Sequence, residues 1–227
     1  MPRFDRTAFA LLLLIGGVLG AIAYGRGSTN AAASQVSSAK PADAHEHHEP
    51  ADEGRSAPSS RVSLADLTSA WRDQTGTERT LTGPREDRRL AVVTMLYTNC
   101  TVSCPRLIAD LKRIEGALTE KQRAQVEFII VSLDPARDTP EKLAAFAKDM
   151  RADDERWTFL NGSDAAVREV ASVLRVRYVT EANGEISHTN RIVVLDAAKE
   201  PIHWQAGLGS GVPGTVEAIQ AQTARDN

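Results

Sequence analysis

The sequence predicts an α/β fold, in which helices flank a mixed central β-sheet. Short apolar runs typical of buried strands alternate with longer segments whose apolar residues recur at helical spacing. The part of the chain from residue 62 to the carboxyl end is long enough for one domain with a proper core, at about 165 residues. This alternation predicts an α/β sandwich, in which the helices pack around a mixed central sheet.

The domain begins with a predicted β-hairpin. Its strands are Leu67–Trp71 and Arg79–Leu81, and the turn Asp73–Gly76 ends on a glycine that can supply a positive φ. Leu90–Leu96 is almost entirely apolar and is therefore predicted to be the first buried strand. Pro105–Leu118 is predicted to be an amphipathic helix, because proline fits the first helical turn and apolar residues follow at helical spacing.

The second half of the domain repeats this alternation. Val126–Leu133 is predicted to be a second buried strand, and Thr139 with Pro140 provides an N-cap and first residue for a helix that ends near Met150. The remaining predicted elements are a short strand at Trp157–Leu160, a helix from Ser163 to about Leu174, a turn at Asn183 and Gly184, a strand at Ile192–Leu195 and a helix from Gly214 to about Ala224.

The amino terminus indicates export. Arg3 and Arg6 precede a stretch from Thr7 to Gly25 that carries no charge, so residues 1–25 are predicted to be a signal sequence or a membrane anchor. Both outcomes agree with the pattern. The rest of the chain is therefore expected in the periplasm or an equivalent compartment, either anchored to the membrane or secreted after cleavage, where free thiols can oxidise.

Residues 26–61 are predicted to be a flexible linker, because they are rich in Ala, Ser, Pro, Glu and His and poor in large apolar residues. His45, His47 and His48 lie close together in this linker and are either a weak divalent-metal site or a solvated tract. The formal net charge of -3 gives no indication of a nucleic-acid partner. Residues 62–227 form the predicted domain.

The two cysteines of the chain, Cys100 and Cys104, are predicted to lie on the loop between the first buried strand and the first helix. Backbone N–H groups at the start of a helix favour negative charge and lower the pKa of a nearby thiol. A thiolate pair there binds soft metal ions or reacts with disulfides, and an inert structural disulfide is the alternative. A cysteine pair directly after a core strand is the thioredoxin-like arrangement.

Three motifs follow one another along the domain: Tyr97–Pro105 with its CxxxC pair, Leu133–Pro140, and Ser187 with His188 before an apolar strand. Together they resemble the Sco/SenC family of copper chaperones, which support the assembly of cytochrome c oxidase. The resemblance implies a thioredoxin-like fold that includes the N-terminal hairpin extension. The chain differs from the family pattern at Asn99 and Ser187, where other members commonly carry a histidine and an acidic residue.

The resemblance further implies copper as the bound metal, with Cys100, Cys104 and His188 as its ligands. The expected partners are a copper-enzyme acceptor such as a cytochrome c oxidase subunit, a thiol reductant, and the membrane through the N-terminal segment. Thiolates are soft donors that suit Cu(I), and imidazole suits both copper oxidation states. His203 is predicted to be a surface or packing residue instead. Asp134 and Asp138 fit turn and helix-start positions, with a supporting role near the site as an additional hypothesis.

The main alternative function is that of a thiol–disulfide oxidoreductase, in which Cys100 and Cys104 are redox-active and His188 is not needed. The CxxxC spacing differs from the CxxC of thioredoxins, which changes the geometry that sets sulfur reactivity. A peroxidase related to peroxiredoxins is a weaker alternative, because the match of Thr101 and Cys104 to its motif lacks the preceding proline.

Overall fold

The computed structural model of the protein describes residues 63–81 and 90–225. The predicted signal or anchor (1–25), the linker (26–61) and its three clustered histidines lie outside the described residues. Within the two described ranges, no helix combines the length and the apolar character needed to cross a membrane.

A seven-stranded mixed sheet forms the centre of the domain, in the order β2-β1-β5-β4-β3-β8-β9. The middle strands β3, β4 and β5 are parallel, whereas β1 pairs antiparallel with β5, and β8 pairs antiparallel with β3. The strands of this sheet are β1 (Ala70–Asp73), β2 (Glu78–Thr80), β3 (Leu90–Leu96), β4 (Val126–Ser132), β5 (Trp157–Gly162), β8 (Arg191–Leu195) and β9 (Pro201–Ala206).

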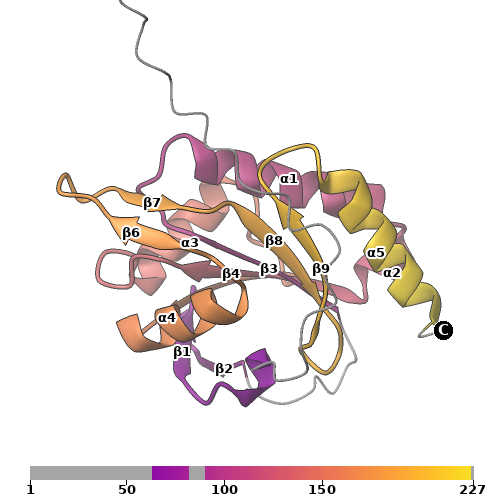
Figure 1. Cartoon of the computed structure of the whole chain (residues 1–227), viewed down its shortest axis with the longest axis horizontal. Helices are drawn as coiled ribbons and strands as arrows, with labels where there is room; N and C mark the ends of the chain where they lie inside the picture. Colours follow the sequence, from indigo (N-terminus) through magenta and orange to yellow (C-terminus); the bar gives the residue numbers. More distant parts are fainter. Residues whose placement is uncertain (1–62, 82–89, 226–227) are drawn as a thin grey trace, which may run out of the picture. The chain divides into compact units, whose positions relative to one another are not determined.

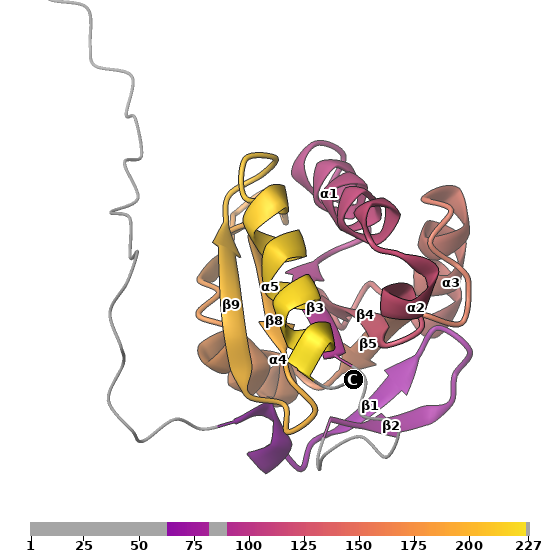
Figure 2. The same ribbon diagram turned by 90° about the vertical axis from the view of Figure 1, so that its right-hand side faces the viewer.

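Helices cover both faces of this sheet. Helix α1 packs against α5, and the two views place α4 on the opposite side of the sheet from α1 (Figures 1 and 2). The helices are the 3-10 turn η1 (Leu64–Asp66), α1 (Ser103–Ala117), α2 (Glu120–Arg123), α3 (Pro140–Asp149), α4 (Asp164–Val173) and α5 (Val212–Arg225). The predicted α/β fold with a mixed central sheet flanked by helices is confirmed.

The core lies where the parallel strands meet the helices on either side. Every residue of β3 and of β4 is buried, as expected for strands that are covered on both faces. The Phe128 and Trp157 rings stack between β4 and β5, with centroids 4.5 Å apart. Because β3 is in the middle of this core, the chain that leaves its carboxyl end begins from a rigid position.

Several predicted boundaries are wrong by a few residues. The first strand of the N-terminal hairpin is Ala70–Asp73, later than predicted, because the buried Asp73 carboxylate accepts hydrogen bonds from the turn N–H groups of Thr75 and Thr77. Helix α1 begins at Ser103, so Cys104 lies in the first helical turn and not on the preceding loop. The final helix begins at Val212, two residues before Gly214.

A second, two-stranded sheet was not predicted as a pair of strands. It consists of β6 (Tyr178–Thr180) and β7 (Ile186–His188), which form an antiparallel hairpin around the predicted turn at Asn183 and Gly184. Figure 1 shows this hairpin extending away from the main sheet. His188 is thus the last residue of a strand, whereas the sequence pattern placed it on a loop before the strand at Ile192.

A substitution at Gly162 can test the packing between β1 and β5. A Cβ at this position would lie 2.6 Å from two ring atoms of the buried Trp71, its direct cross-strand neighbour. We expect Gly162→Ala to lower the free energy of unfolding by about 1–3 kcal/mol, the usual cost of an overpacked core, in urea denaturation. Gly116→Ala is the matched control. Gly116 is exposed in α1 with open space around it, so this variant is expected to gain up to about 1 kcal/mol. A Gly162→Ala protein as stable as the parent would contradict the packing.

Candidate functional site

The sulfur of Cys100 lies at the amino-terminal end of helix α1. Val102 occupies the N-cap position without a side-chain hydrogen bond to the helix, so the first N–H groups need another acceptor. The Cys100 sulfur fills this role, accepting a hydrogen bond from the Cys104 N–H at 3.3 Å, and it lies 3.1 Å from the Ser103 hydroxyl oxygen. The sulfur of Cys100 is thereby held against the positive end of the helix.

The two thiols differ in their readiness to ionise. Burial alone would raise the pKa of Cys100, but hydrogen bonds from Cys104, Ser103 and the N–H groups of Cys104 and Val102 outweigh it and lower the pKa to about 7. Cys104 has no exposed surface, and burial together with the neighbouring Cys100 sulfur raises its pKa well above the usual range. The predicted lowering of a thiol pKa at the helix start therefore applies to Cys100 alone.

His188 reaches the same place from the β6–β7 hairpin. Its Nε2 lies 3.8 Å from the Cys104 sulfur, and its Nδ1 lies 3.2 Å from the carbonyl oxygen of Thr189. When Nδ1 carries the proton and donates it to that carbonyl, Nε2 is left with a free lone pair directed towards the sulfur. Burial lowers the pKa of His188, so the imidazole is neutral at pH 7.

The loop that carries Cys100 is held by the buried carboxylate of Asp138. This carboxylate accepts hydrogen bonds from the backbone N–H and the hydroxyl of Thr98, two residues before Cys100, and from the hydroxyl of Ser132 at the end of β4. The Asn161 side chain in turn donates to the Asp138 carbonyl. Asp138 thus directly contacts Thr98 in the loop that carries Cys100, which agrees with the hypothesis that Asp138 supports the site.

Tyr97 links the cysteine loop to the histidine hairpin. Its hydroxyl accepts a hydrogen bond from the Ile186 N–H at 3.3 Å, and the edge of its ring meets the His188 ring with centroids 6.2 Å apart. The sequence motif included Tyr97 without assigning it a role. Its position directly before the loop, at the end of a buried strand, was the signal that it would face the site.

The structure brings the three predicted ligands to one place as two contacting pairs. Cys100 contacts Cys104 through the hydrogen bonds at the helix start, and Cys104 contacts His188. Among the residues that the structure describes, no three His, Cys, Asp or Glu side chains already form a cluster that could hold a metal ion. His203 lies elsewhere, half-buried between β9 and α5, with Nε2 3.2 Å from the Thr215 hydroxyl, as expected for a packing residue.

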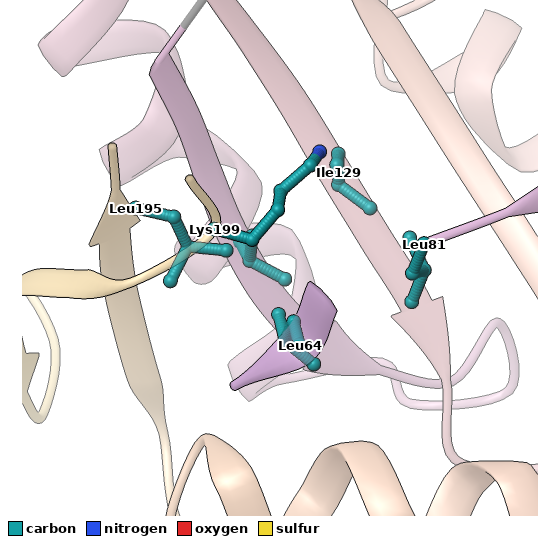
Figure 3. Close-up of a pocket in the computed structure, with 6 residues that line it drawn as sticks. Leu64, Leu81, Ile129, Leu195 and Lys199 are labelled. Carbon is teal, nitrogen blue, oxygen red and sulfur yellow. The ribbon is translucent and has the colours of Figure 1, made fainter. Parts of the chain in front are cut away.

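A small recess at the other end of the strands is separate from this site (Figure 3). Leu195 on its wall pairs with Ala91 at the start of β3, whereas the cysteines follow the end of β3. The recess is lined by Leu64, Leu81, Val93, Ile129, Leu195 and Lys199. Its apolar walls and the ion pair of Lys199 with Glu127, at 3.5 Å, are typical of a core margin.

The fold and the site define a thioredoxin-like protein with a dithiol at the start of its first long helix and a histidine beside it. The family model of SCO1/SenC matches residues 65–210, and the chain belongs to this family. A Stutzerimonas stutzeri protein described as copper-binding is 26% identical over 103 residues, covering 44% of this chain and 49% of that protein. The chain spans about half the length of the sequence relatives it matches.

Solved structures support the same fold. The SCO1/SenC family lipoprotein of Bacillus anthracis has a TM-score of 0.61 at 20% identity, with 68% of this chain and 92% of that chain covered. Copper-bound ScoI of Bradyrhizobium japonicum has a TM-score of 0.55 at 22% identity, with 67% and 96% covered. The predicted thioredoxin-like fold and the predicted family are both confirmed.

The pKa difference between the thiols predicts their reactivity. Because the thiolate is the reacting form, the alkylation rate of Cys100 by iodoacetamide should rise with pH through a midpoint near 7, while Cys104 reacts far more slowly. Ser103→Ala removes one hydrogen bond to the sulfur and should move the midpoint upwards. Mass spectrometry of the reduced protein after timed alkylation measures both rates. A Cys100 midpoint at about 8.5, the usual thiol value, would contradict the geometry.

Proposed function

We propose that the protein is a copper chaperone that carries Cu(I) on Cys100, Cys104 and His188. The observation that carries this proposal is the meeting of a poised thiolate, a buried thiol and a neutral imidazole at one helix start. Two soft sulfur donors favour Cu(I), and a three-donor set leaves the ion exchangeable.

The spacing of the donors suits a shared ion. A sulfur and an imidazole nitrogen that bind one first-row ion, with the bond lengths of zinc sites and the roughly 120° angle of a three-donor set, lie about 3.8 Å apart. The separation of the Cys104 sulfur and the His188 Nε2 is 3.8 Å. Cys100 joins this pair as the ion binds, and the buried Cys104 thiol releases its proton at the same time, because metal binding selects the thiolate.

The family and its relatives support copper as the cargo. The Stutzerimonas relative is described as copper-binding, and the Bradyrhizobium structure contains copper. We propose delivery to a membrane or exported copper enzyme such as cytochrome c oxidase, with residues 1–25 as a signal or membrane anchor and 26–61 as a tether. A tether of this kind raises the effective concentration of the domain near a membrane-bound acceptor. A thiol reductant keeps the pair able to bind copper.

Substitution of the ligands tests the proposal. Cys100→Ser, Cys104→Ser and His188→Ala should each weaken Cu(I) binding by the reduced protein, measured by competition with a chromogenic chelator under anaerobic conditions. His203→Ala is the matched control, because it removes the other histidine of the described domain and should leave copper affinity unchanged. Unchanged stoichiometry and affinity in all three ligand variants would overturn the site assignment.

A second function, thiol–disulfide exchange, is favoured by the difference between the two thiols. An exposed thiolate that attacks a partner disulfide and a buried thiol that resolves the mixed disulfide are the two roles which exchange requires. Cys100, partly exposed with its lowered pKa, and Cys104, fully buried, match these roles. In this reaction the protein dithiol becomes a disulfide as the disulfide of the acceptor becomes a dithiol.

His188→Ala separates the two functions. It removes a copper donor but neither thiol, so copper affinity should fall while disulfide reductase turnover with a small disulfide substrate remains within about twofold of the parent. Loss of both activities together, with the fold intact by circular dichroism, would contradict this separation, because it would show that thiol reactivity also depends on His188.

A further inference from the structure

We propose that Arg137 is a positioning residue that holds the β6–β7 hairpin, and with it His188, over the thiols. This inference rests on the proposed copper site. Arg137 lies between the two aspartates of the Leu133–Pro140 motif, and sequence reasoning assigned it no role.

The Arg137 guanidinium bridges two parts of the chain. Its Nε donates to the Asp134 carboxylate, and its Nη2 donates to the carbonyl oxygen of Gly184 at the tip of the hairpin. Asp134 is fixed in turn, because its N–H donates to the Ser132 hydroxyl at 3.0 Å. The guanidinium therefore connects the rigid end of β4 to a hairpin that belongs to a different sheet. A planar fork with several donors is suited to such a bridge, whereas a lysine is not.

The tip of the hairpin is shaped to receive this side chain. Gly184 has a φ of +81°, a conformation that favours glycine, and a Cβ there would lie 3.2 Å from the Arg137 Nη1. The turn is closed by hydrogen bonds from the Gly184 N–H to the Glu181 carbonyl and from the Glu181 N–H to the Glu185 carbonyl. A side chain at position 184 would push the guanidinium away from the turn.

The hairpin needs such a tie because its strands are short. Each strand has three residues, and an isolated two-stranded hairpin has marginal stability in water. The Tyr97 hydroxyl holds the middle of the hairpin through Ile186, and Arg137 holds its tip. His188, at the opposite end of β7 from the tip, is aimed at Cys104 by these two contacts and by its link to β8. Loss of the tip contact lets β7 tilt, so that the imidazole spends less time near the sulfur.

Arg137→Gln tests this role through a double-mutant cycle with His188→Ala. Outer contacts that orient metal ligands typically contribute 10–100-fold to affinity, so Arg137→Gln should weaken Cu(I) binding about tenfold in the parent. It should have no further effect in the His188→Ala background, because the residue that it positions is gone. Arg106→Gln is the matched control. Arg106 is exposed on α1, two residues after Cys104, so this variant removes the same charge close to the site. This control should stay within twofold of the parent.

Hydrogen–deuterium exchange of the copper-free protein provides a second measurement. Arg137→Gln should speed the exchange of residues 178–188 while leaving β3 and β4 protected. Three results would overturn the proposal. The first is unchanged exchange of the hairpin in Arg137→Gln, and the second is a copper affinity of Arg137→Gln equal to that of the parent. The third is that Arg137→Gln lowers copper affinity as much in the His188→Ala background as it does in the parent. If His188→Ala alone bound copper as tightly as the parent, the proposed ligand set would fail, while the exchange measurement would still decide whether Arg137 holds the hairpin.

Discussion

The placement of the reactive thiols depends on one buried carboxylate, that of Asp138. It receives the N–H and hydroxyl of Thr98 and the hydroxyl of Ser132, so the chain leaving β3 is tied to the chain leaving β4. A buried acceptor left without its hydrogen-bond donors destabilises a protein by about 1–3 kcal/mol or more, which makes this network hard to rearrange. The Cys100 loop therefore starts from a fixed point, and helix α1 begins where the Cys100 sulfur can meet its first free N–H groups.

The candidate site draws its side chains from two separate sheets. Strand β3, in the middle of the seven-stranded sheet, delivers the cysteines, while the small β6–β7 sheet delivers His188. Hydrogen bonds of the Tyr97 and Arg137 side chains connect this hairpin to the rest of the domain, in addition to the contact of His188 with Cys104. The sulfur part of the site is thus rigid, and the imidazole part is held by contacts that a single substitution can remove.

The sequence predicted the buried strands and the long helices well, because their apolar spacing and caps are local properties. Leu90–Leu96 was predicted without error, and Thr139 and Ser163 cap their helices as expected. The β6–β7 hairpin was missed, since three-residue strands with exposed residues have too few apolar positions to show a period. The local sequence also could not predict that the pKa values of Cys100 and Cys104 shift in opposite directions, because these shifts depend on which sulfur the folded core encloses. The same holds for Arg137, whose partner Gly184 is distant in sequence.

Because Cys104 is fully buried, the two sulfurs of the site differ in their accessibility to other molecules. Cys100 lies at the surface and Cys104 behind it, so an approaching molecule meets the outer sulfur first. In either proposed function, an incoming copper ion or disulfide would therefore meet Cys100 before Cys104, and a departing ion would leave Cys100 last. This difference in accessibility is a property of the folded chain and is the same for every molecule that approaches the site.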